Sequence, residues 1–339
     1  MQKREGYCLG IESTADDFGV GIVSFSGEIL ANVNNVYIPE TGGIHPREAS
    51  RHHAMVAGSV IAEAFRRAGI KPKEIDVIAF SQGPGLGPCL RVGATAARAL
   101  ASYLNKPLVG VNHCLAHIEI GKMISEARDP VTLYVSGGNT IVAAFEARRY
   151  RVFGETLDIA VGNCLDVFAR EAGLKPRADK PFGAIVEELA SKGGRFIPLP
   201  YTVKGMDLSF SGLLTAAVNL LREGKYSLED LYFSFQEIAF SMLTEVTERA
   251  LAHTEKGEVL LTGGVAANKR LQAMLKTMSE EHDACFRVVP KEYATDNGAM
   301  IAWTGVLCYQ YGFTIPVEES FVRLKWRLDD VEVPWVKID

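Results

Sequence analysis

Two stretches of the chain share one pattern of apolar and polar residues. Residues 7–25 contain an apolar segment, a polar turn at 12–17 and a second apolar segment, and residues 131–145 repeat this plan around a Ser-Gly-Gly-Asn-Thr turn. Short apolar runs separated by turn residues are typical of β-hairpins. The pattern predicts one hairpin near the start of each half of the chain.

Helices and strands are expected to alternate after each hairpin. The first half continues with an amphipathic helix ending near Arg67, a buried strand over residues 75–81, an alanine-rich helix over residues 90–104 and a further strand. The second half continues with a long helix over residues 234–251 and a strand, a glycine turn and a helix over residues 259–271. Alternation of this kind predicts an α/β fold.

Two halves that both open with a hairpin resemble the duplicated fold of actin, hexokinase and Hsp70, in which paired hairpins embrace the phosphates of a nucleotide. The resemblance implies two related lobes, residues 1–127 and 128–339, around a nucleotide and metal cleft, with the final helix packing back on the first lobe. Glycines in the turn at 136–140 suit phosphate binding because backbone N–H groups can approach the anion closely. A plain hairpin turn is the alternative.

Composition limits the class of protein. With 339 residues, of which 47% are hydrophobic, the chain can bury a large core. It shows no run of eighteen apolar residues and no signal-peptide pattern, and its six cysteines form no CxxC pair. We therefore expect a cytoplasmic protein with reduced thiols and no membrane segment. The net charge of −5 argues against coating nucleic acid by bulk electrostatics, although basic clusters at 66–73 and 148–151 leave local contact with a polyanion open.

The stretch Val111–Glu119 carries His113 and His117, four residues apart in a predicted helix that Asn112 opens. Side chains at this spacing lie on one helix face, close enough to share a metal ion. Ordinary helical histidines are the alternative. The zinc-protease motif HExxH has the same spacing but needs a glutamate after the first histidine, where this chain has Cys114.

Nine segments resemble the TsaD-type threonylcarbamoyl transferases, formerly described as O-sialoglycoprotein endopeptidases, and together they cover nearly the whole chain. The Asn of SGGNT and the segment LDIAVGNCLDVFARE are similar to the archaeal and eukaryotic branch, the catalytic subunit of the KEOPS complex. In chain order the segments are GIESTADD, GGIHPREASRHH, GPGLGPCLRVG, NHCLAHIE, LYVSGGNT, LDIAVGNCLDVFAR, SFSGL, TGGVAANKRL and TDNGAM.

The resemblance implies a transferase that moves a threonylcarbamoyl group from threonylcarbamoyl-AMP to the exocyclic amine of the adenosine 3′ of the anticodon, in tRNAs reading codons that begin with A. AMP would leave, and an ATP- or AMP-type nucleotide would occupy the same cleft. The implied partners are tRNA and the other KEOPS subunits, which are a small atypical kinase, a dimerising subunit and an accessory subunit. Some archaeal relatives carry the kinase fused behind this domain, and that arrangement stays open for this chain.

The resemblance also implies particular site residues. Carried over by position, the metal ligands are His113, His117, Tyr134 and Asp296. The adenylate contacts are Tyr134, Val135, Ser136, Gly137, Gly138, Asp166, Gly183, Glu187 and Asn268. A mixed nitrogen and oxygen ligand set suits iron first, and zinc or manganese as well.

Proton removal from the weakly basic amine of the acceptor would need a base. Glu12 and Asp16, on the first hairpin, are the candidates, and a capped turn is the alternative for both. One stretch departs from the family: relatives have YPGGP before the ribose-binding glutamate, whereas residues 175–190 here read KPRADKPFGAIVEELA. The register of Gly183 and Glu187 is therefore open by one residue.

Three other functions remain as alternatives. A metallopeptidase would need a base near the metal, which HCLAH does not supply. A sugar or acetate kinase of the same fold class would transfer the γ-phosphate of ATP and has no use for HxxxH with a distant aspartate. A nucleotide-binding module without catalysis would show no turnover.

Overall fold

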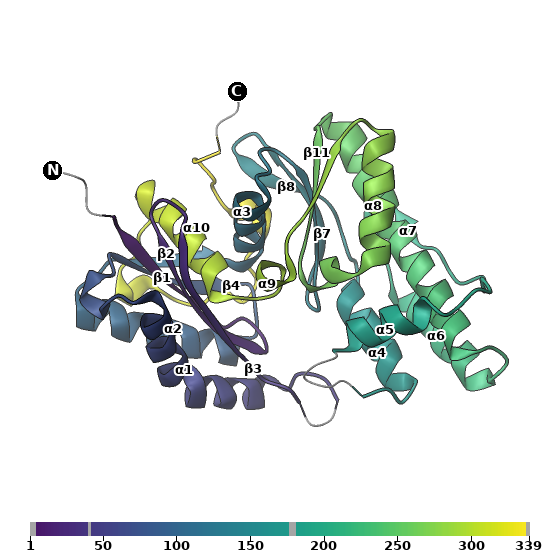
Figure 1. The fold of residues 1–339 in the computed structure, drawn as a ribbon, viewed down its shortest axis with the longest axis horizontal. Coiled ribbons are helices and arrows are strands. Elements are labelled where there is room, and N and C mark those ends of the chain that lie inside the picture. Colours follow the sequence, from purple (N-terminus) through teal and green to yellow (C-terminus); the bar gives the residue numbers. More distant parts are fainter. Residues whose placement is uncertain (1–4, 40–41, 176–180, 337–339) are drawn as a thin grey trace. The chain divides into compact units, whose positions relative to one another are not determined.

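The computed structural model describes residues 5–39, 42–175 and 181–336. These residues form two compact units (Figure 1). The first unit comprises Met1–Met123 together with Asp296–Asp339, and the second comprises Ile124–Thr295. The sequence analysis counted residues 128–339 as the second lobe and expected its final helix to pack back on the first lobe, and residues 296–339 group with the first unit.

A five-stranded mixed sheet forms the centre of the first unit. Its order is β3-β2-β1-β4-β5, with antiparallel pairs within β1–β2–β3 and parallel pairs within β1–β4–β5. The strand bounds are β1 Tyr7–Glu12, β2 Asp17–Ser24, β3 Ile29–Val36, β4 Val77–Gly83 and β5 Leu108–Asn112. The predicted first hairpin is confirmed, and it continues into a third strand, β3, that the sequence analysis did not predict.

Helices cover both faces of this sheet because strand residues alternate between the two sides. Leu9 and Ile11 of β1 share a core with Val60 and Ala94 of the helices on one face, whereas Gly10 faces the helix on the other. The first face carries α1 Pro46–Ala68 and α2 Gly87–Leu104, and the opposite face carries α10 Gly298–Gln310. The helix α3 His113–Ser125 follows β5 directly.

The second unit repeats the topology of the first. Its sheet order β8-β7-β6-β11-β12 has antiparallel pairs within β6–β7–β8 and parallel pairs within β6–β11–β12, strand for strand as in the first sheet. The bounds are β6 Val131–Val135, β7 Thr140–Glu146, β8 Arg149–Glu155, β11 Glu258–Thr262 and β12 Cys285–Val288. The second predicted hairpin and the duplicated fold are therefore confirmed.

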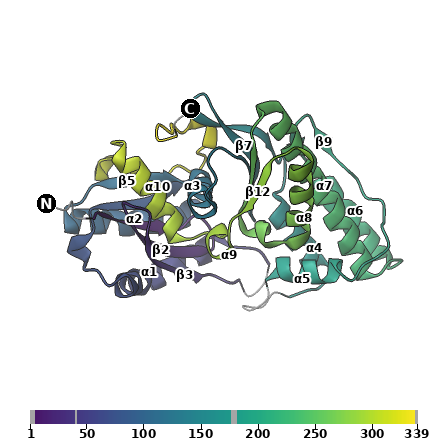
Figure 2. The ribbon, with the colours of Figure 1, turned by 45° about the horizontal axis from the view of Figure 1, so that its top comes forward.

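Helices of the second unit pack in a row beside its sheet, and Figure 2 shows α6, α7 and α8 side by side. The longest, α7, contacts β6, β7 and β8, and α8 contacts β11 and β12. The helix bounds are α4 Val161–Glu171, α5 Phe182–Ala190, α6 Ser211–Glu223, α7 Leu228–Thr254, α8 Lys269–Glu281 and α9 Lys291–Ala294, and a two-stranded ribbon pairs β9 Val203–Lys204 with β10 Asp207–Leu208.

Helix α10 lies unusually close to β1 and β2. A Cβ atom added at Gly10 would overlap the backbone nitrogen of Ala302, and one added at Gly21 would overlap that of Ala299. Glycines at these positions therefore let helix and sheet pack backbone to backbone. Side chains of β3 fasten the start of the helix: Asn34 Nδ2 donates to the carbonyl of Asp296 at 2.6 Å.

The chain after α10 returns along the first sheet. Ile315 N donates to the carbonyl of Leu108 at 2.9 Å, which adds one antiparallel bridge at the edge strand β5. Further on, Arg323 N donates to Gln82 O, and Asn112 Nδ2 donates to Trp326 O at 3.1 Å. Throughout the described ranges of the chain, no helix is both long enough and apolar enough to cross a bilayer.

The close packing of α10 predicts a large stability effect at Gly21. Gly21→Ala should lower the free energy of unfolding by at least about 2–3 kcal/mol, because the new methyl group overlaps helix backbone that cannot move alone. Gly58→Ala is the matched control, because this exposed glycine lies inside α1 with open space at its Cβ position. The control should raise stability by up to about 1 kcal/mol. Urea midpoints of the three proteins measure both effects, and equal midpoints for Gly21→Ala and wild type would contradict the packing.

Candidate metal centre and adenylate-binding segments

The two histidines follow directly from the end of a parallel strand. β5 ends at Asn112, whose Oδ1 accepts a hydrogen bond from Leu115 N at 3.1 Å and so caps the first turn of α3. The predicted opening of this helix by Asn112 is confirmed. His113 is then the first residue of α3 and His117 lies one turn later, with ring centroids 4.8 Å apart.

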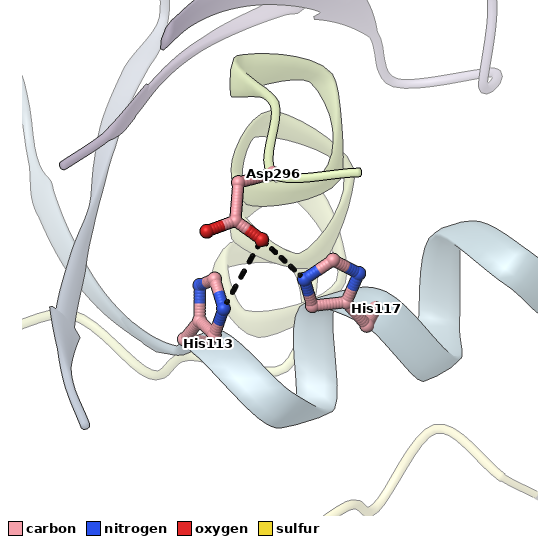
Figure 3. A group of neighbouring side chains, drawn as sticks. All are labelled: His113, His117 and Asp296. Atoms are coloured by element: carbon pink, nitrogen blue, oxygen red, sulfur yellow. Dashed lines mark hydrogen bonds and ion pairs between the residues drawn. The ribbon is translucent and has the colours of Figure 1, made fainter. Parts of the chain in front are cut away.

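Asp296 joins the two histidines, although it lies 179 residues beyond His117. Its Oδ1 is 3.0 Å from His117 Nε2 and 3.5 Å from His113 Nε2 (Figure 3). The aspartate immediately precedes Asn297, the residue that caps α10 by accepting from Met300 N. Packing of α10 on the sheet therefore places this carboxylate at the histidine pair.

Two residues of the first hairpin complete the surroundings. Glu12 is fully buried, and its Oε2 lies 3.1 Å from His113 Nδ1. Its Oε1 accepts from Thr14 N at 2.6 Å. The hydroxyl of Thr14 donates toward Asp296 Oδ2 at 3.5 Å. Both oxygens of Glu12 thus face partners inside the first unit, and Asp16 is half-buried on the same turn.

Burial and the carboxylates act against each other in setting the pKa values. Burial alone would lower the pKa of His113, but the charges of Glu12 and Asp296 outweigh it and raise the pKa to about 9. Burial lowers the pKa of His117. Burial opposes ionisation of Asp296, yet the charge on His113 and the hydrogen bond from His117 outweigh it and lower the aspartate pKa. Without a metal, the site therefore contains an imidazolium between carboxylates.

This group of side chains could hold a metal ion. One ligand atom from each of His113, His117 and Asp296 lies within 4.8 Å of the other two. Bonds of about 2 Å to nitrogen and oxygen need only small side-chain movements from such positions. Two imidazoles and one carboxylate form the ligand set typical of non-haem iron sites, and zinc also accepts it. A bound cation would displace the proton of His113 and replace its charge.

The Ser-Gly-Gly-Asn turn of the second unit is stabilised by hydrogen bonds within the turn and by hydrogen bonds to the start of α4. Ser136 Oγ accepts from Gly138 N at 3.3 Å and from Asn139 N at 3.0 Å, so these two amides already have a partner within the turn. The first turn of α4 lies against it: Gly162 N donates to Ser136 O at 3.2 Å, and Val161 N donates to Thr140 Oγ1 at 2.9 Å. The turn and the helix that carries Asp166 are thus one connected structure.

Two other predicted contacts meet at the start of α8. Asn268 caps this helix, since its Oδ1 accepts from Arg270 N at 2.9 Å, and its Nδ2 donates to Gln236 Oε1 at 2.8 Å. Glu187 of α5 accepts from the next amide, Lys269 N, at 2.6 Å. The two side chains therefore occupy one helix terminus.

The predicted site residues fall into two groups, one in each unit. His113, His117, Asp296 and Glu12 come together in the first unit, and Tyr134, at the end of β6, belongs to the second. Burial raises the pKa of Asp166 to about 6, with Arg170 opposing the shift. Gly183 is exposed at the start of α5, and residues 176–180 of the departing stretch lie outside the described residues.

Sequence reasoning missed Asp158 as an organising residue. Its carboxylate accepts from the hydroxyls of Ser209 and Ser211 and from the amides of Phe210, Ser211 and Ile159. Burial opposes ionisation, but these hydrogen bonds outweigh it and hold the pKa of Asp158 well below its usual range. The segment LDIAVG and the motif SFSG, quoted separately in the sequence, are joined by this one carboxylate. One segment leads into α4 and the other into α6, and nothing in the sequence indicates that they are in contact.

Comparison with solved structures defines the fold class. HypF from T. kodakarensis superposes with a TM-score of 0.64 at 16% identity, over 91% of this chain and 48% of that one. Together with the two matching sheets, this likeness identifies an α/β protein of the duplicated actin, hexokinase and Hsp70 class.

Sequence comparison then defines the family. The family model described as TsaD, tRNA N6-adenosine threonylcarbamoyltransferase, matches residues 28–303. The tRNA N6-adenosine threonylcarbamoyltransferase of Archaeoglobus fulgidus is 59% identical over 327 residues, 96% of this chain and 99% of that protein. The chain therefore belongs to the TsaD family, a family of transferases of tRNA modification, as the sequence motifs indicated.

A second relative is longer than this chain. The probable bifunctional tRNA threonylcarbamoyladenosine biosynthesis protein of Methanothermobacter thermautotrophicus is 59% identical over 330 residues. That match covers 97% of this chain but 61% of that protein. The chain thus corresponds to less than two thirds of this relative and to nearly all of the Archaeoglobus protein.

The raised pKa of His113 predicts a pH dependence of stability in metal-free protein. The pKa of this histidine is about 6.5 in the unfolded chain and about 9 in the folded protein. Its protonation therefore contributes its full stabilisation of the folded state below pH 6.5, and this contribution is lost as the pH rises to 9. The loss should be on the order of 1–3 kcal/mol. His53, whose pKa burial lowers to about 4, and His117 titrate below this window.

Urea denaturation at pH 6.5, 7.5 and 9 in the presence of a chelator measures the effect. The His113→Asn variant should have a lower free energy of unfolding than wild type at every pH. Between pH 6.5 and 9, however, its free energy of unfolding should fall much less than that of wild type. An equal decline in both proteins would show that another group causes it.

Proposed function

We propose that the chain is a tRNA N6-adenosine threonylcarbamoyltransferase, which transfers the threonylcarbamoyl group of threonylcarbamoyl-AMP to the adenosine 3′ of the anticodon in tRNAs reading codons that begin with A. We also propose that it works as the catalytic subunit of a KEOPS complex. The observation that carries the proposal is the meeting of His113, His117 and Asp296 in a chain that matches the TsaD family over residues 28–303.

The proposed metal ligands are those three residues, with Tyr134 as a fourth from the family resemblance. A bound ion, iron first and zinc or manganese as alternatives, would act as a Lewis acid toward the carbamoyl carbonyl or the leaving phosphate. The metalloprotease alternative gains no support from the described site, because position 114 holds a cysteine and Glu12 points to His113 Nδ1.

The proposed adenylate contacts lie in the second unit. Asp166 and Glu187 would accept hydrogen bonds from ribose hydroxyls, and Asn268 would donate its remaining Nδ2 hydrogen, since its oxygen already caps α8. For Asp166 this role needs the ionised carboxylate, so adenylate affinity is expected to weaken below about pH 6. Asp16 is the proposed base for the acceptor amine.

The glycines of the Ser-Gly-Gly-Asn turn support a phosphate contact. Neither Gly137 nor Gly138 has a positive φ, and among the described residues no atom outside the glycine and its two chain neighbours lies within 4 Å of a Cβ at either position. The chain itself therefore has no conformational or packing need for glycine at these two places. Close approach of a ligand is a reason that remains.

Transfer of labelled threonine from threonylcarbamoyl-AMP to a tRNA reading an A-starting codon tests the function. The assay compares the protein alone and the protein with archaeal KEOPS partners. Because the acidic chain should bind tRNA weakly by itself, label is expected mainly with partners, and His113→Ala should reduce it at least about 100-fold while binding no metal. Absence of label with partners present, or equal label with His113→Ala, would contradict the proposal.

The open surroundings of Gly138 predict that ligand binding and stability can be separated. Gly138→Ala should leave the urea midpoint nearly unchanged, because its methyl group meets no neighbour in the described structure. It should weaken AMP binding about tenfold or more if a phosphate approaches this backbone. Calorimetric titration with AMP measures the affinity, with Gly212→Ala as control, since that exposed glycine also has open space but lies in the first turn of α6. Unchanged AMP affinity would remove the turn from the site.

A further inference from the structure

Glu12 occupies an unusual place for a carboxylate. It ends strand β1, where it pairs with Gly19 of β2, and it has no exposed surface. Its Oε1 accepts from Thr14 N at 2.6 Å, so the following loop fixes one oxygen. The other oxygen, Oε2, then lies 3.1 Å from His113 Nδ1. Backbone pairing and the loop together hold this oxygen on the histidine ring.

In a neutral His113 ring, which is the form that binds a metal, this contact favours the tautomer with its proton on Nδ1. A carboxylate oxygen at this distance accepts a hydrogen bond from Nδ1. In the neutral ring the lone pair is then on Nε2. That atom faces Asp296 Oδ1 at 3.5 Å, and His117 Nε2 reaches the same oxygen at 3.0 Å. Both Nε2 atoms thus converge on one point, with Glu12 behind the first ring.

We propose that Glu12 is a positioning residue that selects the Nε2-ligating tautomer of His113 and fixes the orientation of its ring. The inference deepens the proposed function and rests on its metal site. Carboxylates that accept from a metal-bound imidazole commonly set metal affinity by about 10–100-fold. Glu12 therefore acts on metal binding, and removal of the substrate proton belongs to another group.

An amide at position 12 cannot reproduce both contacts. Glu12→Gln keeps the shape of the side chain but has one acceptor oxygen. If that oxygen accepts from Thr14 N, the amide N–H₂ faces His113 Nδ1 and favours the tautomer with hydrogen on Nε2, so that Nε2 has no lone pair for a metal. If the amide is reversed, its N–H₂ faces the donor Thr14 N. In either orientation, one of the two hydrogen bonds that hold Glu12 against Thr14 and His113 is lost.

Cobalt(II) titration followed by visible absorption measures the affinity directly and needs no activity. Glu12→Gln should bind Co(II) about 10–100-fold more weakly than wild type. Glu119→Gln is the matched control, because Glu119 is another buried glutamate of the first unit and its oxygen lies 4.0 Å from Lys122 Nζ on α3. The control should bind Co(II) within about threefold of wild type, and His117→Ala should lose the Co(II) spectrum.

A second measurement uses the wild-type protein and does not depend on folding of a variant. In the Zn(II)-loaded protein, ¹⁵N-edited spectra should show His113 with Nε2 bound to the metal and a slowly exchanging proton on Nδ1. Metal bound through Nδ1, or Co(II) affinity of Glu12→Gln equal to wild type, would overturn the inference while leaving the metal site intact. Equal Co(II) binding by wild type and His117→Ala would overturn the metal site and this inference with it.

Discussion

Backbone-to-backbone packing of α10 on the first sheet is the contact on which the candidate centre depends. A helix can approach β1 and β2 this closely only because Gly10 and Gly21 lack a Cβ. The approach brings Asn34 within reach of the carbonyl of Asp296. Asp296 is thereby fixed at two histidines that lie far away in the sequence. A ligand set assembled from separate segments needs a rigid contact of this kind, because small displacements move ligand atoms out of range.

Opposite charges lie side by side inside the first unit. Glu12 is buried and Asp296 is partly buried beside His113, and an imidazolium between the two carboxylates reduces the energy needed to keep those charges away from water. A divalent cation would serve the same purpose with a larger charge. The metal-free and metal-bound states therefore differ by exchange of a proton for a cation. In the second unit, the predicted site residues include no such cluster of a histidine between carboxylates. The turn between β6 and β7 of that sheet carries the two glycines instead.

The sequence predicted the parts of the molecule whose signals are local. Both hairpins, the helix opened by Asn112 and the duplicated class of fold follow from spacing and turn residues, and family motifs indicated His113, His117 and Asp296. The contact of Glu12 with His113 and the cluster around Asp158 could not be read in this way, since each joins segments whose distance is set by tertiary packing. The final helix was expected to pack back on the first lobe, but which sheet face it would meet depends on the glycines of β1 and β2, and this could not be read from the sequence.

The single bridge between Leu108 and Ile315 has a meaning beyond local stability. β5 is the edge strand of its sheet, and an uncovered edge offers hydrogen-bonding groups to strands of other molecules. At Leu108 the carbonyl is already engaged by the chain's own returning segment. This segment therefore hinders edge-to-edge pairing of β5 with a strand of another molecule. Assembly with another protein through an added strand at this point of β5 would first require displacing it.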